Sequence, residues 1–294
     1  SFANGDGSIA TETSIKGTYD SSGWAYGVTL SADGKTALIA DAASGLQIID
    51  VGDSFANGDG SIATETSITF TGRPGSSLTT YPITLSADGK TAFVAMSNGG
   101  LDIIDFSNPA NPTLISNFAT SAYTYEVNLS ADGKTAFVAD QSNGLNIINI
   151  SDLANPTLIS DYDTSDNANG LTLSADGKTA FVADGLDGLD IIDVSDPANP
   201  TLTGNYDTSG GARGVTLSAD GKTAFVADNS NGLDIINISD PANPTLTGNY
   251  NTSGSARGVT LSADGKTAFV ADNNDGLDII DVSDLANPTL TGTL

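Results

Sequence analysis

The chain has 294 residues, 38% of them hydrophobic, and a formal net charge of −26 at neutral pH. Such an acidic surface repels nucleic acids and anionic membranes, so we expect neither as a partner. The chain has no histidine and no cysteine, which excludes disulfides, thiol catalysis, Ser-His-Asp triads and zinc sites built from those residues. It has no long apolar run, so we expect no membrane span.

The charge fits two situations. It keeps a protein soluble in any medium, and it also suits a medium rich in salt or in divalent cations. The frequent Gly, Ser, Thr, Asn and Asp residues are typical of turns and strands. No long stretch has apolar residues at helical spacing, so we expect almost no helix.

The chain opens on SFANGDGSIATETSI, and these fifteen residues return unchanged at 54–68. The second copy leads into a predicted strand at the outer edge of a repeating unit. Residues 14–19 align with 245–250, which occupy the same outer position in a later repeat. We therefore expect residues 1–20 to supply an outer strand as well.

The motif LSADGKTA occurs six times in the chain. The copies begin at Leu30, Leu85, Leu129, Leu173, Leu217 and Leu261. The first spacing is 55 residues and the other four are 44 residues. A period of 44 residues is typical of a four-stranded propeller blade.

One period, 214–251, predicts four strands. GVTLS (214–218) and TAFVAD (223–228) are joined by the tight turn ADGK, in which Gly221 can take a positive φ. LDIINIS (233–239) is apolar enough to be buried on both faces, and TLTGNYN (245–251) is a more polar outer strand. This gradient fits a blade whose outermost strand borders solvent.

The predicted fold is all-β: one six-bladed β-propeller of four-stranded antiparallel blades, with the ring closed by the N-terminal outer strand. The chain forms a single domain, 1–294. It divides into the outer strand 1–20 and blades at about 24–72, 79–120, 123–164, 167–208, 211–252 and 255–294.

GLDIIDVSDPANPTL at 188–202, with its counterparts in the other repeats, resembles the LVIVD-repeat β-propellers. The preceding LSADGKTAFVAD is similar to the P-D-G-K-x-x-Y-V-A strand pair of related bacterial surface propellers. The resemblance covers essentially the whole chain. It implies a propeller of bacterial or archaeal origin, often extracellular, and it implies no particular activity.

The positions just before the inner strands vary where their surroundings hardly do. We call these residues the crown: Tyr26, Tyr81, Tyr125, Asn169, Arg213 and Arg257, with Trp24 two residues before Tyr26. Aromatic, Arg and Asn side chains can stack on and hydrogen-bond a sugar. The crown is therefore a candidate carbohydrate site, and the alternative is that its side chains only plug the channel.

Two loops between the second and third strands carry several carboxylates. DGLDGLD (184–190) and DNNDGLD (272–278) place Asp184, Asp187, Asp272, Asn274 and Asp275 near a glycine. Oxygen ligands of this kind suit Ca²⁺. Neither loop keeps the EF-hand register. Calcium is nevertheless the only cofactor that the sequence suggests.

Two other recurring features are interpreted as structural. The lysine of each SADGK turn is expected to pair in part with the aspartate two residues earlier. The residue that ends each third strand is Asp50, Asp105, Asp193 or Asp281, or Asn149 or Asn237. Asn replaces Asp readily where the side chain accepts backbone hydrogen bonds, which indicates a turn-capping role.

No catalytic arrangement is visible. Acid–base chemistry would need a histidine or a placed pair of carboxylates, and the only glutamates are Glu12, Glu65 and Glu126. The sequence therefore predicts that the protein is not an enzyme.

The repeats contain six copies of the inner strands and seven outer strands, so one outer strand is surplus. The N-terminal outer strand contains Ile15 and Tyr19, and the C-terminal outer strand contains Leu290 and Leu294. The two strands compete for the same edge of blade six, so these four residues are the candidate assembly residues. Three explanations remain open: a piece of a longer array, an extra strand, or strand addition to another subunit. The functional prediction is a secreted structural or adhesive module at a cell surface that self-associates, with binding of a surface glycan as the alternative.

Overall fold

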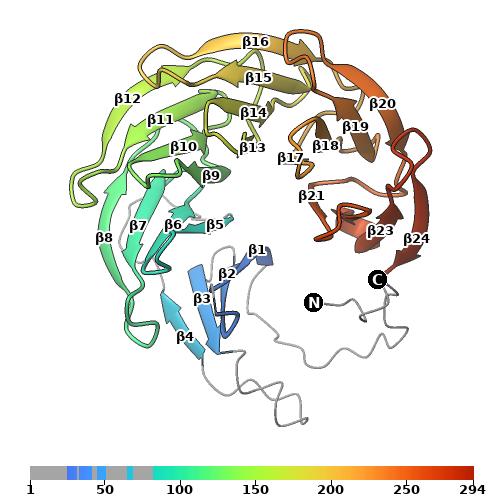
Figure 1. Cartoon of the computed structure of the whole chain (residues 1–294). Coiled ribbons are helices and arrows are strands. Elements are labelled where there is room, and N and C mark those ends of the chain that lie inside the picture. Colours follow the sequence, from blue (N-terminus) through green and yellow to red (C-terminus); the bar gives the residue numbers. More distant parts are fainter. Residues whose placement is uncertain (1–24, 32, 42–44, 51–64, 69–81) are drawn as a thin grey trace, which may run out of the picture.

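A computed structural model describes residues 25–31, 33–41, 45–50, 65–68 and 82–294. Their strands form six antiparallel sheets of four, arranged around a common centre as the blades of a propeller (Figure 1). In each blade the first strand lies innermost and the fourth outermost. The predicted all-β six-bladed propeller is confirmed. Its predicted closure by residues 1–20 lies outside the described residues.

The strands of the six blades have the following bounds. Blade one comprises β1 (Ala25–Leu30), β2 (Thr36–Asp41), β3 (Gly45–Asp50) and β4 (Glu65–Ile68). Blade two comprises β5 (Ile83–Leu85), β6 (Thr91–Ala95), β7 (Leu101–Asp105) and β8 (Thr113–Phe118). Blade three comprises β9 (Glu126–Leu129), β10 (Thr135–Ala139), β11 (Leu145–Asn149) and β12 (Thr157–Tyr162).

Blade four comprises β13 (Gly170–Leu173), β14 (Thr179–Ala183), β15 (Leu189–Asp193) and β16 (Thr201–Tyr206). Blade five comprises β17 (Gly214–Leu217), β18 (Thr223–Ala227), β19 (Leu233–Asn237) and β20 (Thr245–Tyr250). Blade six comprises β21 (Gly258–Leu261), β22 (Thr267–Ala271), β23 (Leu277–Asp281) and β24 (Thr289–Thr293). One 3₁₀ turn, η1 (Asn273–Asp275), precedes β23, and no helix in the described chain could span a membrane.

The SADGK turn holds the inner and second strands of a blade together. In blade five, Asp220 Oδ1 accepts hydrogen bonds from Ser218 Oγ at 2.6 Å and from the Lys222 N–H at 3.1 Å. The glycine of this turn has a φ of 67–69° in all six copies, and Gly221 has a φ of 67°. A residue with a side chain would be strained in this conformation. The same hydrogen bonds recur in the other five turns. The motif is therefore a structural turn.

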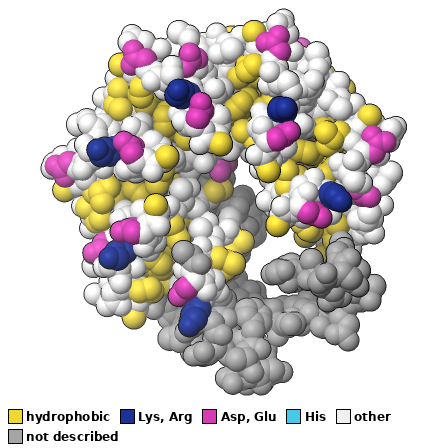
Figure 2. All heavy atoms as spheres, viewed as in Figure 1, with side chains coloured by type: hydrophobic (Ala, Val, Ile, Leu, Met, Phe, Trp, Pro, Cys, Tyr) yellow, Lys and Arg dark blue, Asp and Glu magenta, His cyan; other side chains and the backbone are white. Residues whose placement is uncertain are grey.

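The lysine of each turn is exposed. Figure 2 shows the basic side chains spread around the face in view, each beside an acidic one. The pKa of Asp220 is lowered mainly by its hydrogen bonds with Ser218 and the Lys222 backbone, and to a smaller extent by the Lys222 charge. The small contribution of the lysine charge to the pKa of Asp220 is consistent with the expected partial pairing of lysine and aspartate.

The third strand ends where its last side chain turns back onto the chain. Asn237 Oδ1 accepts the Ser239 N–H at 3.0 Å, and Asp193 accepts the Ser195 N–H at 2.9 Å. This bond explains why β19 stops at Asn237 and not at Ser239 as predicted from the apolar run, because it bends the backbone out of the sheet. The capping interpretation fits both residue types.

The apolar core lies between neighbouring blades. Phe225, Leu233 and Ile235 of blade five, for example, form one cluster with Val270 and Ile280 of blade six. Similar clusters join blades one to two, two to three, three to four and four to five. Burying each such side chain contributes about 1.5–3 kcal/mol, so the ring depends on these blade-to-blade contacts.

Candidate functional site at the mouth of the ring

The crown residues occupy equivalent places in four blades. The backbone N–H groups of Tyr125, Asn169, Arg213 and Arg257 donate to the carbonyl of the last alanine of the second strand, at 2.8–2.9 Å. Their side chains therefore stand at the same end of the inner strands. The Tyr26 side chain, Trp24 and Tyr81 lie outside the described residues.

Two crown residues meet across a blade boundary. Arg213 Nη1 donates to Asn169 Oδ1 at 3.3 Å, and Asn169 Nδ2 donates to the Ala212 carbonyl at 3.0 Å. Both residues are half-buried, whereas Arg257 is exposed. The structure thus brings Asn169 and Arg213 together into one polar group and leaves Arg257 apart from it.

A third polar residue, Glu126, lies beside this pair and was not among the predicted site residues. A Cβ on Gly170 would lie 3.4 Å from Glu126 Oε2 and 2.7 Å from the Arg213 carbonyl oxygen. Glu126 and the Asn169–Arg213 pair therefore flank the same glycine. The missing side chain at Gly170 leaves the space in which the glutamate sits.

The Glu126 carboxyl group titrates near neutral pH. Its burial raises the pKa to about 7, and a hydrogen bond with the Leu171 backbone opposes this rise. No cation contributes to the shift. Asn128 lies two residues further along β9, and its Nδ2 donates to the Leu171 carbonyl at 3.0 Å. The face of β9 that carries Glu126 and Asn128 is therefore turned towards blade four.

A position-by-position comparison of the repeats contains the signal that would have identified Glu126. The equivalent residues are Gly27, Pro82, Gly170, Gly214 and Gly258. A charged side chain at a position otherwise held by glycine or proline, on an inner strand, departs from the structural requirement of the repeat. Such a departure indicates a functional residue more strongly than variation at the neighbouring crown position.

The loop 184–190 gathers three carboxylates. Asp184, Asp187 and Asp190 each offer an oxygen within 4.8 Å of the others, so this group could hold a metal ion. Burial raises the pKa of Asp184, and it raises that of Asp190 to about 6, with a smaller contribution from the neighbouring carboxylates. Asp190 was absent from the predicted ligands.

The corresponding loop of blade six is arranged differently. Among the described residues, Asp272 and Asp275 do not form a comparable group with Asp278, because residues 273–275 turn into the 3₁₀ segment η1. Thr252 Oγ1 and the Gly254 N–H donate to the Asp272 carboxylate. The Asn274 side chain lies outside the described residues.

The predicted assembly residues can be placed only at the C-terminal end. Leu290 is 41% exposed and Leu294 67% exposed, and both lie on or beside β24, the last strand of blade six. Ile15 and Tyr19 lie outside the described residues. Whether these strands add to another subunit stays a prediction.

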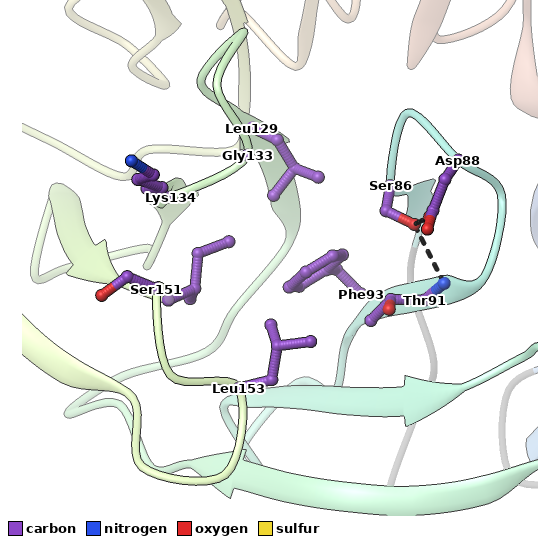
Figure 3. Close-up of a pocket in the computed structure, with 10 residues that line it drawn as sticks. Ser86, Asp88, Thr91, Phe93, Leu129, Gly133, Lys134, Ser151 and Leu153 are labelled. Atoms are coloured by element: carbon purple, nitrogen blue, oxygen red, sulfur yellow. Dashed lines mark hydrogen bonds between the residues drawn. The ribbon is translucent and has the colours of Figure 1, made fainter.

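Figure 3 shows a pocket between blades two and three, at the opposite end of the inner strands from Glu126. Phe93 and Leu153 form its floor, and the turn residues Ser86, Asp88 and Lys134 form its rim. Asp88 Oδ1 accepts the Ser86 hydroxyl at 2.6 Å, and this bond lowers its pKa. The rim is therefore made of the structural turns described above.

Six matches to the LVIVD repeat span the chain, at residues 23–55, 84–120, 126–164, 168–208, 209–252 and 253–294. The chain belongs to the LVIVD-repeat family. The predicted resemblance is thereby confirmed. No curated protein matches this LVIVD-repeat chain.

Solved structures of low sequence identity share the fold. The Pseudomonas aeruginosa periplasmic gluconolactonase is 17% identical with a TM-score of 0.78, covering 99% of this chain and 89% of its own. A putative 6-phosphogluconolactonase from Bacteroides fragilis is 16% identical with a TM-score of 0.73, covering 93% and 84%. The β-propeller domain of Myceliophteria thermophila Cps50 (Swd1) is 14% identical with a TM-score of 0.72, covering 94% and 88%.

These matches correct one expectation. From the sequence we predicted that the protein is not an enzyme, but two of the similar propellers are described as a gluconolactonase and a putative 6-phosphogluconolactonase. The exclusion was wrong because it required a histidine or a carboxylate pair. A single carboxyl group with a pKa near the working pH is sufficient for general base catalysis, and the pKa of Glu126 is raised to about 7.

Proposed function

We propose that this propeller binds a small sugar lactone at the crown and hydrolyses it, with Glu126 as the general base. The observation that carries the proposal is the half-buried Glu126 carboxyl group, with a pKa of about 7, beside the Asn169–Arg213 pair. The likeness of the fold to two lactonase structures supports this substrate class. A sugar lactone as substrate also agrees with the prediction that the crown binds a carbohydrate.

Hydrolysis needs one base and hydrogen-bond donors. The Glu126 carboxylate takes a proton from water while the water oxygen bonds to the lactone carbonyl carbon, and the carbonyl electron pair moves onto its oxygen. Asn169 and Arg213 supply N–H donors for that oxygen and for the sugar hydroxyls. When the intermediate collapses, the ring C–O bond breaks and the leaving oxygen takes the proton from Glu126, which releases a hydroxy acid and restores the carboxylate.

The test is the hydrolysis of D-glucono-1,5-lactone above the spontaneous rate in buffer. Glu126→Gln keeps the shape of the side chain and removes the base, so the catalysed rate should fall by about 10²–10⁴-fold. Glu126→Gly, which places the residue of four other blades at this position, should show the same loss while the protein stays folded.

A matched control is Asp161→Asn on the outer strand β12 of the same blade, since Asp161 is exposed and the change in charge is identical. It should keep the wild-type rate. A wild-type rate equal to that of buffer would contradict the proposal, and so would a Glu126→Gln variant as active as wild type.

We propose Ca²⁺ as the ion for the group formed by Asp184, Asp187 and Asp190, because the donors are all carboxylate oxygens. Blade five carries Asn231 at the position of Asp187, so Asp187→Asn is a change that the fold already accommodates. Millimolar CaCl₂ should raise the Tm of the wild type more than NaCl of equal ionic strength does. Asp187→Asn should reduce the difference between the two salts, and a difference that it leaves unchanged would contradict the site.

The secreted, cell-surface setting and the binding of a surface glycan remain proposals as well. The acidic composition supports the first, and the aromatic and polar crown supports the second. Localisation of the tagged protein in its source cells, and a glycan array with Arg213→Ala, would test them.

A further inference from the structure

The boundary between blades five and six shows what one blade needs in order to accept the next. Phe225, Leu233 and Ile235 of blade five are fully buried there against blade six. Two glycines allow the close approach. A Cβ on Gly214 would lie 2.9 Å from the Arg257 carbonyl, and a Cβ on Gly248 would collide with the carbonyl of Leu285.

Blade six repeats this accepting surface residue for residue. Its equivalents are Phe269, Leu277 and Ile279, with Gly258 on the inner strand and Gly292 on the outer strand. We call these five residues, with Ala271, the blade-six face.

The blade-six face carries no blade among the described residues. Phe269, Leu277 and Ile279 are only half-buried, and Ala271 is exposed although its counterpart Ala227 is fully buried. No described atom lies within 4 Å of a Cβ placed on Gly258, and only Ile279 of the same blade approaches one on Gly292. The surface is thus complete at the inner strand, the middle of the sheet and the outer strand, and open at all three.

Blade one carries the matching surface, which is open along the inner strand β1, whereas Ala37 on β2 is buried. Residues 27–37 read GVTLSADGKTA, identical to residues 258–268, which are the part of blade six that lies on blade five. Val28 is 67% exposed and Leu30 56% exposed. Val127 and Leu171, the equivalents of Val28 in blades three and four, are fully buried against the preceding blade, and Leu129 and Leu173, the equivalents of Leu30, are half-buried. We call Val28, Leu30 and Ile39 the blade-one face.

We propose that the blade-six face of one molecule binds the blade-one face of a second copy of this chain. The interface continues the one that the chain already makes between blades five and six, with the same residues on both sides. The contact is head to tail, because its two surfaces differ and lie at opposite ends of the run of blades. A pair of associated copies keeps one free face of each kind, so association propagates or closes into a ring of copies.

The net charge of −26 opposes this contact, because each copy repels the next. The faces themselves are apolar, so burial drives association while long-range repulsion weakens it. Salt screens the repulsion without weakening the apolar contact. Association should therefore strengthen as the NaCl concentration rises, which distinguishes it from association through ion pairs.

The test uses two variants that each block one face. Ala271→Lys places a long charged side chain on the blade-six face, and the double change Val28→Lys/Leu30→Lys does so on the blade-one face. These positions are already exposed, so both variants should fold, which circular dichroism and the melting temperature check. Leu186→Lys is the matched control, since Leu186 is 75% exposed and belongs to neither face.

Sedimentation velocity in high salt gives the readout. The mass of the wild type and of Leu186→Lys should rise above 29.6 kDa with protein concentration. Each blocked variant should stay monomeric by itself, whereas an equal mixture of the two should form a dimer and nothing larger, because one good face remains on each partner. A wild type that is monomeric at every concentration, or a mixture that fails to form the dimer, would overturn the proposal and place the contact within one chain.

Discussion

At the scale of single residues, small departures from the repeat determine where charge is buried. Glu126 stands at a position that is otherwise Gly or Pro, and partial burial raises the pKa of its carboxyl group to about 7. Asp190 and Asp234 are buried carboxylates of the repeat itself, and burial raises the pKa of each to about 6. Both kinds of group are uncharged more readily in the folded protein than in the unfolded chain.

This difference predicts how stability depends on pH. Asp190 and Asp234 have an ordinary pKa of 3.8 and a folded-state pKa of about 6, so the folded protein binds more protons between these values. The free energy of unfolding therefore falls as the pH rises from about 4 to 6. The turn aspartates such as Asp220, whose pKa is lowered, lose their contribution only below that window.

The Tm should accordingly be higher near pH 5 than at pH 7, by a few degrees, in thermal melts at constant ionic strength. Asp234→Asn removes one of the titrating groups, and blade three carries Asn146 at this position. The variant should show a shallower fall in Tm over the same pH range. A Tm that is flat, or that rises towards pH 7, would refute the assignment.

At the scale of strands, blades two, four and five join the third strand to the outer strand with a polar pair, which in blade two is Asn117 Nδ2 donating to Asp102 at 2.8 Å. Asn205 Nδ2 donates to Asp190 at 2.9 Å and Asn249 Nδ2 donates to Asp234 at 2.6 Å, in both cases between directly opposed residues. Blade three has the two residue types exchanged, as Asn146 opposite Asp161. There Asn146 Nδ2 donates to Asp140 Oδ2 at 3.0 Å instead.

Blade six lacks the amide of this pair. Asp278 is buried and stands opposite Thr293, and its Oδ1 atom has no hydrogen-bond partner among the described residues. Thr293→Asn restores the donor found in blades four and five, and it should raise the free energy of unfolding by about 1 kcal/mol. Denaturant titration measures the change; Thr289→Asn, on the same strand at an exposed position, should have no effect. An unchanged midpoint for Thr293→Asn would contradict this account of the pair.

At the scale of the whole molecule, the chain is a series of nearly identical interfaces. Apolar clusters join the blades from one to six in order, while the first and last blades present complementary surfaces that are open in the described chain. Repeats of this kind carry the information for a further contact at each end. The proposed head-to-tail association is the use of that information between copies.

The features that depend on short-range chemistry could be predicted from the order of residues alone. The spacing of LSADGKTA predicted the blades, the Asp and Gly of each turn predicted the hairpins, and the exchange of Asp for Asn at the third-strand end predicted a cap. Each of these acts on neighbours within a few residues, so the order of residues is sufficient to reveal it.

Which polar groups are buried and which faces stay open depends on the packing of the blades, which the sequence does not reveal. The pKa of Glu126 depends on blade four, 44 residues further along the repeat, and the grouping of Asp190 with Asp184 and Asp187 depends on how one loop turns. The blade-six face has the same residues as the surface of blade five that blade six covers. The blade-five residues Phe225, Leu233 and Ile235 are fully buried, whereas their counterparts Phe269, Leu277 and Ile279 are only half-buried. Burial is a property of what packs against a residue, and that neighbour is distant in the sequence.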